Sequence, residues 1–276
     1  MATIPEYAEL RCVSNFTFLR GASQPEELVE RAMKLGYQAL AIADECSLSG
    51  VVRAHVAAKE HGLKLLIGSQ FQVKCNFPFT LTVLAVNLNG YGNLCEFITK
   101  LRMASEKGTY RLELANIAGS ELTDCVVVAS PKRMSTPAQL EQAAVWVLEN
   151  FIGRCWLGVD LLRLLDDELW LYRLREVSEH TAIPLVAAGD VHFHVRSHKA
   201  LQDVLTATRI GKPLTECGLD LQPNAERHLR ISLGLPLRSP LRRFRSSRRN
   251  FCAAALGRQL ARISTGALRT HTKWKY

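Results

Sequence analysis

The chain has 276 residues, of which 47% are hydrophobic, and a formal net charge of +9. This length and composition suffice for one sizeable α/β core or two smaller ones, and they exclude a chain that is disordered throughout. The sequence has no apolar run of about 18 residues and no signal-peptide pattern at its start, so we expect neither a membrane span nor export. Its 8 cysteines are scattered without a Cys-x-x-Cys pair. This distribution is typical of reduced thiols and indicates a cytoplasmic protein.

Predicted strands recur along most of the chain. Val-, Ile-, Leu- and Ala-rich runs, typical of strands covered on both faces, span 39–44, 63–73, 79–87, 125–130, 155–162 and 183–193. Helical patterns lie between them. This alternation predicts a parallel sheet or barrel, in which functional residues gather at the carboxyl ends of the strands.

Two of the predicted helices have readable starts. In SQPEELVERAMKLG, Ser23 is the expected N-cap, Glu26 completes a capping box and Gly36 ends the helix. The stretch 135–150 repeats this plan with Thr136 and a proline in the first turn. Its expected core face consists of Leu140, Ala143, Ala144 and Val147.

The stretch GDVHFHVRSH (189–198) concentrates four metal-ligating side chains, those of Asp190, His192, His194 and His198. Alternate side chains of an extended segment project to one side, so Asp190, His192 and His194 would form one chelating edge. Zinc and manganese sites need roughly four to six donors. Further ligands must therefore come from elsewhere in the chain.

Polar residues of the required kind also follow predicted strands. Asp44 and Glu45 come at the end of one apolar run, and Gln70 lies near the end of the next. A barrel would bring them to the same end as Asp190, which favours a metal site. The alternative is that Asp44 and Asp190 cap the turns or helices that follow them.

Five separated blocks resemble the amino-terminal PHP (polymerase and histidinol phosphatase) domain of bacterial C-family DNA polymerases, in particular the error-prone branch. The blocks are YAELRCVSNFTFLRGASQPEELVERA (7–32), ALAIADECSLSGVVRAH (39–55), GYGNLCEFIT (90–99), PLVAAGDVHFHVRSHKALQDVLTATRIGKPL (184–214) and LQPNAERHL (221–229). The resemblance spans residues 6–229. It implies an α/β fold, a distorted β/α barrel of about seven strands. It also implies a truncated chain, because the polymerase region of this family follows the PHP domain.

Metal-competent members of the wider family, as the resemblance implies, bind two or three metal ions that hydrolyse phosphoesters. The family's ligand positions that are kept here are Asp44, Asp190 and His192, and those that are lost are Arg11, Val13, Glu45 and Gln70. His194 and His55 are possible extra ligands. An arginine in place of histidine repels a divalent metal, and Arg11 could instead pair with Asp44 or Asp190. We therefore expect a degenerate site without catalytic residues, able at most to hold one zinc or manganese ion weakly.

The resemblance implies a chain that is the PHP portion of an error-prone DNA-directed DNA polymerase active in damage-associated DNA synthesis. The palm that binds Mg²⁺ would lie beyond residue 276, so we expect a structural role here and no nucleotidyltransferase activity in isolation. DNA and replication or translesion accessory proteins would be partners of the intact polymerase. The alternatives are a metal-dependent phosphoesterase or 3′–5′ exonuclease, and a small DNA-binding adaptor.

The basic charge is confined to the end of the chain. Residues 1–226 hold 22 Lys and Arg and all 26 Asp and Glu, a net charge of −4, whereas residues 227–276 hold 13 Lys and Arg and no acid. The abrupt change predicts that 230–276 is a basic tail that is either non-native, translated out of frame, or simply disordered. The functional alternative is an arm that binds DNA phosphates, centred on Arg242, Arg243, Arg245, Arg248 and Arg249.

Overall fold

A computed structural model describes residues 7–230 of the chain. The basic tail predicted for 230–276 lies outside the described residues except for Arg230, and so do the five arginines of the candidate DNA-binding arm. No helix within residues 7–230 combines the length and the apolar character needed to cross a bilayer.

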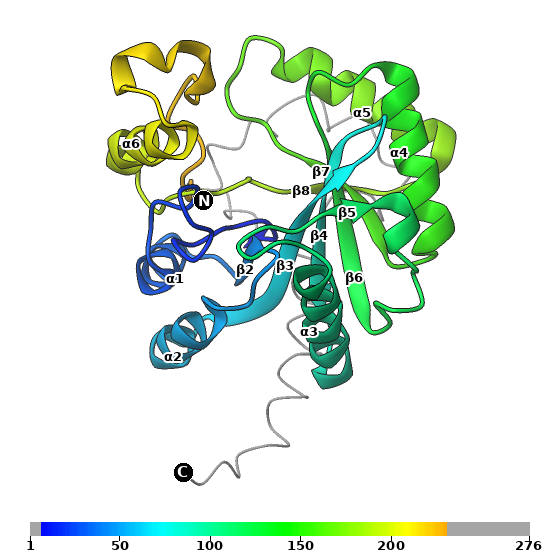
Figure 1. Cartoon of the computed structure of the whole chain (residues 1–276), viewed down its shortest axis with the longest axis horizontal. Coiled ribbons are helices and arrows are strands. Elements are labelled where there is room, and N and C mark those ends of the chain that lie inside the picture. Colours follow the sequence, from blue (N-terminus) through cyan, green and yellow to red (C-terminus); the bar gives the residue numbers. More distant parts are fainter. Residues whose placement is uncertain (1–6, 231–276) are drawn as a thin grey trace, which may run out of the picture.

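A single twisted sheet forms the centre of the molecule (Figure 1). Its strand order is β1, β2, β3, β4, β6, β7 and β8, and the short strand β5 pairs with β3. The bounds are β1 (Ala8–Glu9), β2 (Ala39–Glu45), β3 (Lys64–Lys74), β4 (Phe79–Ala85), β5 (Leu112–Glu113), β6 (Cys125–Pro131), β7 (Cys155–Val159) and β8 (Leu185–Ala187). Strand β4 runs antiparallel to β3 and β6, while the other pairings are parallel. The expected parallel arrangement is thus interrupted by one reversed strand.

The two edges of this sheet meet where the chain leaves β8. Cys12 and Val191 form an isolated parallel bridge, and the N–H of Val13 donates to the carbonyl of Val191 at 2.9 Å. The Glu9 carboxylate accepts the N–H of Gly189 at 2.8 Å and that of Arg11 at 2.9 Å. These contacts nearly close the sheet, which confirms the expected distorted β/α barrel.

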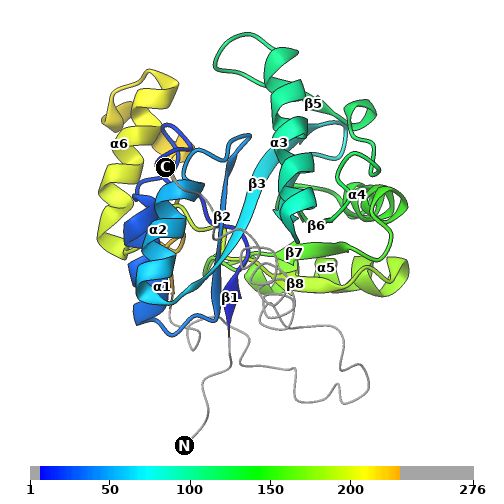
Figure 2. The ribbon, with the colours of Figure 1, turned by 90° about the horizontal axis from the view of Figure 1, so that it is seen from below.

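The described part of the chain has six α-helices around the sheet. They are α1 (Pro25–Lys34), α2 (Val51–His61), α3 (Leu88–Met103), α4 (Pro137–Asn150), α5 (Asp167–Thr181) and α6 (Lys199–Ile210). Helices α1, α2 and α6 lie on one side of the barrel and α3, α4 and α5 on the other (Figures 1 and 2). Short 3₁₀ helices η1 (Leu114–Asn116), η2 (Arg196–His198), η3 (Leu214–Glu216) and η4 (Gly218–Asp220) complete the helical structure. Helices α1 to α5 pack on the sheet, whereas α6 packs on η2 and η3, and the ends of the strands are left for polar residues.

The predicted start of α4 is confirmed, and that of α1 is displaced by one residue. The hydroxyl of Thr136 accepts the N–H of Gln139, and the four residues of the predicted core face are buried. The N-cap of α1 is Gln24, not Ser23, and its N–H donates to the Glu27 carboxylate at 2.8 Å. This shift leaves the buried Ser23 hydroxyl free to contact other residues.

Candidate functional site

The end of the barrel that contains Arg11, Gln70, Asp190 and His192 is called here the barrel mouth. Arg11 follows β1 and is 8% exposed. Its Nη2 atom lies 3.0 Å from Oδ1 of Asp190, and its Nε–H donates to Oε1 of Gln70 at 3.1 Å. Of the two carboxylates considered as partners, Arg11 therefore pairs with Asp190. The Asp190 contact is an ion pair without hydrogen-bond alignment, because Oδ1 is buried without a hydrogen-bond partner among the described residues.

The second oxygen of Asp190 faces another guanidinium. Nη1 of Arg227 forms an ion pair with Oδ2 of Asp190. Burial lowers the pKa of Arg227 to about 10, which still leaves it charged near neutral pH. A buried carboxylate needs such partners, because an unpaired charge inside a protein is very costly. The Asp190 carboxylate is thus enclosed between two cations.

His192 completes this group as a neutral side chain. Its Nε2 atom is 3.4 Å from Oδ1 of Asp190, and its Nδ1 atom is 3.5 Å from the amide nitrogen of Gln202. Burial, together with the positive charges of Arg11 and Arg20, lowers the pKa of His192 to about 3. The ring is therefore uncharged at neutral pH.

Asp44 lies at the same end of the barrel, but its carboxylate is hydrogen-bonded to a turn. Its Oδ1 accepts the N–H of Ser14 and the hydroxyl of Thr17, both at 2.7 Å, and its Oδ2 accepts the hydroxyl of Ser14 at 2.8 Å. Burial raises the pKa of Asp44, while these hydrogen bonds act against the rise. Both oxygens thus hold the turn that follows β1.

Glu45 is also paired with a cation. Nε of Arg20 lies 3.0 Å from its Oε2, and the Tyr110 hydroxyl donates to its Oε1 at 2.8 Å. Beside this pair is a cavity of about 730 Å³, whose walls include Arg20, Glu45, Tyr110, Phe16 and Arg102. Every acid of the predicted ligand set therefore has a protein partner.

The other predicted positions lie apart from this group. Val13 is buried and apolar, and His55 lies on α2 on the outside of the sheet. His194 does not share an edge with Asp190 and His192, because the chain is not regularly extended there. Asp190 has a φ of 48°, in the left-handed region, and while His192 still lies 3.4 Å from Asp190, the His194 ring contacts Ser23 and Glu27.

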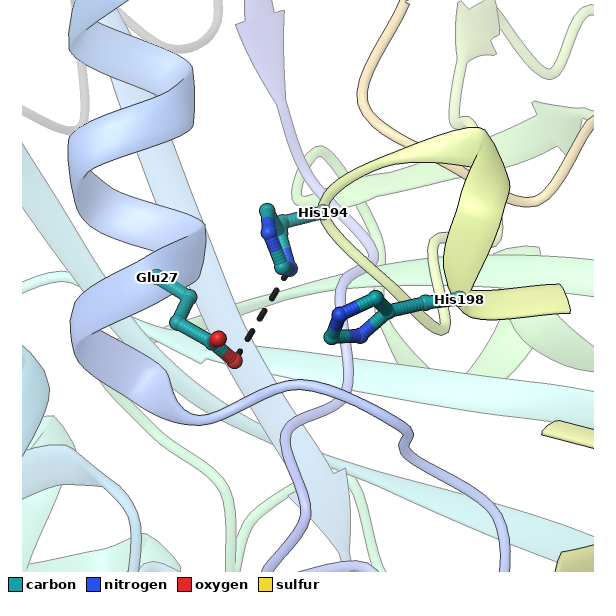
Figure 3. A group of neighbouring side chains, drawn as sticks. All are labelled: Glu27, His194 and His198. Atoms are coloured by element: carbon teal, nitrogen blue, oxygen red, sulfur yellow. Dashed lines mark ion pairs between the residues drawn. The ribbon is translucent and has the colours of Figure 1, made fainter. Parts of the chain in front are cut away.

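His194 instead belongs to a second cluster with Glu27 and His198, shown in Figure 3. Its Nδ1 atom is 3.8 Å from Oε2 of Glu27 and 2.7 Å from the Ser23 hydroxyl. The rings of His194 and His198 are 4.4 Å apart between centroids and nearly perpendicular. All three side chains are partly buried, and one potential ligand atom from each lies within 4.8 Å of the other two.

Two residues of these clusters, Arg227 and Glu27, are not among the site residues predicted from the sequence. Arg227 stands far from Asp190 along the chain, and only the need of a buried carboxylate for a cation could have suggested a partner. Glu27 has no place in the capping box expected from the sequence, which joins Ser23 and Glu26, whereas in the structure its carboxylate accepts the N–H of Gln24. Its position relative to His194 depends on how α1 packs, which local sequence does not encode.

The model of the family described as PHP domain matches residues 9–142. The chain contains a PHP domain. Sequence relatives extend this result: an error-prone DNA polymerase of Dechloromonas aromatica is 48% identical over 237 residues, covering 84% of this chain and 22% of the relative. One from Ralstonia nicotianae is 46% identical over 245 residues, covering 84% and 23%. The prediction of a PHP domain like that of error-prone DNA polymerases is confirmed, and the chain spans less than a quarter of these relatives' length.

Solved structures similar to this PHP-domain chain share its fold. A protein from Bifidobacterium adolescentis described as a metal-dependent phosphoesterase has a TM-score of 0.51 and 16% identity, covering 68% of this chain and 88% of that one. An amidohydrolase from Chromobacterium violaceum, with sulfate and without metal, has a TM-score of 0.54 and 14% identity, covering 67% and 87%. At such low identities the likeness concerns the fold alone.

Proposed function

We propose that this chain is the PHP portion of an error-prone DNA polymerase and that its barrel mouth has a structural role. The similarity of 84% of the chain to error-prone DNA polymerases supports the first part. The second part rests on one observation, the two guanidinium groups that face both oxygens of Asp190. DNA, Mg²⁺ and replication or translesion accessory proteins would be engaged by polymerase regions that the longer relatives have.

The residues of the mouth do not fit the metal cluster that the PHP resemblance implies. Both oxygens of Asp44 accept hydrogen bonds from the turn after β1. Gln70 is neutral, so it offers no negative charge to a metal ion. Its Oε1 already accepts a hydrogen bond from Arg11. A zinc or manganese ion beside Asp190 would lie next to two cations, whose repulsion is strong in a poorly solvated site. His192 is left as a single ligand without a carboxylate to assist it.

Hydrolysis assays on the purified chain test this proposal. Nitrophenyl phosphate and a labelled DNA 3′ end are incubated with added manganese or zinc, and Asp190→Asn is the control. We expect no metal-dependent rate above that of the control, because the mouth has no complete metal site to generate a hydroxide. Metal-dependent hydrolysis that Asp190→Asn abolishes would establish the phosphoesterase or exonuclease alternative instead.

We also propose that the domain occupies residues 6–229 and that the tail is not part of it. The last described residue, Arg230, lies one position beyond this boundary and is 6% exposed. Its carbonyl accepts the Tyr37 hydroxyl at 2.6 Å, and its guanidinium donates to the carbonyl of Leu161 at 2.8 Å. The packed body thus includes the first residue after the proposed boundary.

The origin of the tail can be tested at the level of the gene. The encoding DNA is resequenced beyond codon 229 and translated in all three frames. We expect another frame to continue with a mixed-charge segment similar to the error-prone polymerases. If no frame does so, and deleting residues 231–276 abolishes binding to duplex DNA, the tail is a DNA-binding arm.

A further inference from the structure

We propose that Glu27, His194 and His198 form a binding site for one divalent transition-metal ion, Zn²⁺ being the best match. This cluster lies outside the barrel mouth, between the first turn of α1 and the segment around η2 (Figure 3). The proposal does not depend on the function proposed for the chain.

The distances are close to those of a zinc site. Zinc binds nitrogen and carboxylate oxygen at about 2.0 to 2.2 Å, so the ligand atoms of a tetrahedral site are about 3.3 to 3.5 Å apart. Oε2 of Glu27 and Nδ1 of His194 are already 3.8 Å apart, and the ligand atoms of all three side chains lie within 4.8 Å of one another. Small side-chain rotations would bring them to zinc-binding distance, without movement of α1 or η2.

The hydrogen bonds of the two histidines are compatible with metal binding. Nδ1 of His198 is 2.8 Å from the carbonyl of Ala22, which can only accept, so this nitrogen carries the proton and Nε2 presents its lone pair. Metal-bound histidines almost always donate their other N–H to such a carbonyl or carboxylate. The Ser23 oxygen accepts the backbone N–H of His194 at 2.9 Å and lies 2.7 Å from Nδ1 of the same residue, so its hydroxyl can donate to the lone pair of Nδ1, which a metal ion would take in place of this hydrogen bond.

The charges around the cluster also favour a cation, in contrast to the barrel mouth. Within residues 7–230, the ion pair recorded for Glu27 is with His194, and no arginine or lysine pairs with its carboxylate. The N–H of Gln24 takes one lone pair of Oε2, and the carboxylate offers several more. Two imidazoles and one carboxylate are a known ligand set for Zn²⁺, with water in the open fourth position. An ion bound there would join α1 to the chain that follows β8.

The full-length protein is titrated with Zn²⁺ in a calorimeter and with Co²⁺ as a spectroscopic probe. We expect one equivalent to bind, with a Co²⁺ absorption in the visible range, and Zn²⁺ to raise the melting temperature. His198→Ala should weaken binding by more than about 100-fold, since even changes to residues behind the ligands cost 10- to 100-fold. Glu27→Gln should have the same direction of effect, and because its side chain is 40% exposed, it should leave the fold intact.

Matched control variants distinguish this site from other side chains of the protein that could bind a metal ion. His55→Ala removes a histidine from α2, and Glu26→Gln changes the neighbouring glutamate, so both should bind Zn²⁺ as the unchanged protein does. Absence of binding, or binding that Glu27→Gln and His198→Ala leave unaltered, would overturn the proposal. Binding lost in His192→Gln but kept in His198→Ala would place the ion in the barrel mouth, which also overturns it.

Discussion

The buried Asp190 carboxylate meets two guanidinium groups and a neutral imidazole. The carboxylate is 5% exposed, and Arg11 and Arg227 approach it from both sides. A bound metal ion would supply the same neutralising charge to a buried acid. Arginines supply it permanently and cannot be removed by a chelator, so the mouth is expected to remain stable without any metal.

The variant Arg11→Met tests whether the Arg11–Asp190 ion pair stabilises the barrel mouth. The change leaves the buried Asp190 with one cation and Gln70 without its donor. Removing one partner of a buried pair costs about 3 to 5 kcal/mol, and the remaining Arg227 contact should reduce this loss. Urea unfolding measures the difference, and a double-mutant cycle with Asp190→Asn isolates the coupling between the two residues. An unchanged urea midpoint in Arg11→Met would contradict the assignment.

His192 should make stability depend on pH. Its pKa is about 3 in the folded chain and about 6.5 when unfolded, so between these values only the unfolded chain takes up the proton. Its contribution to the free energy of unfolding is therefore complete above pH 6.5 and falls as the pH is lowered towards 3. His192→Gln lacks this term, so the stability of the unchanged protein relative to the variant should fall between pH 7.5 and pH 5. A difference that stays constant over this range would exclude a buried neutral ring.

At the scale of the elements, sequence patterns predicted where the strands lie better than the direction in which each strand runs. Continuous apolar runs identified β2, β3, β4 and β6 because strands covered on both faces need such side chains. The reversal of β4 was missed, since an apolar run is the same in either direction. The run 183–193 yields a strand only over Leu185–Ala187, because Asp190 adopts a left-handed backbone.

In the site, too, the sequence predicted which residues could form contacts but not all of the partners that tertiary packing brings to them. Arg11 was expected to pair with Asp44 or Asp190, and its partner is Asp190. Arg227 and Glu27 were missed, because each meets its partner only through tertiary packing. Local patterns specify what a residue can bind, whereas the packing of α1 and of the chain after β8 decides what it meets.

The junction between β1 and the chain after β8 can be tested at Gly189. A Cβ atom at this position would lie 2.3 Å from Oε2 of Glu9, whose carboxylate is held by the Tyr7 hydroxyl and two backbone N–H groups. Gly189→Ala should therefore destabilise the protein by about 1 to 3 kcal/mol. Gly92→Ala, inside α3 and with open space around it, is the control and should be neutral or slightly stabilising. Equal thermal shifts for both variants would contradict the close contact.

At the scale of the whole molecule, residues 224–230 connect the packed body to the tail. A chain that ends at Arg230 keeps the Arg227 ion pair and the Tyr37 hydrogen bond, so it should melt cooperatively and like the full chain. A chain that ends at Pro223 loses both and should melt at a lower temperature. Differential scanning calorimetry compares the three forms. If both shortened chains melt alike, the proposed boundary is wrong.

The closure of the barrel is uneven around its circumference. Strands β2 and β3 pair along the whole of β2, whereas the chain after β1 and the chain after β8 share one backbone bridge, Cys12 with Val191. Local opening there breaks two backbone hydrogen bonds, the Gly189–Glu9 hydrogen bond and the Arg11–Asp190 ion pair, and it needs no global unfolding. Amide hydrogens of Val13 and Val191 should therefore exchange with solvent faster than those of Ile42 and Leu66. In solution the molecule would then behave as a curved sheet whose two edges separate and pair again, rather than as a permanently closed barrel.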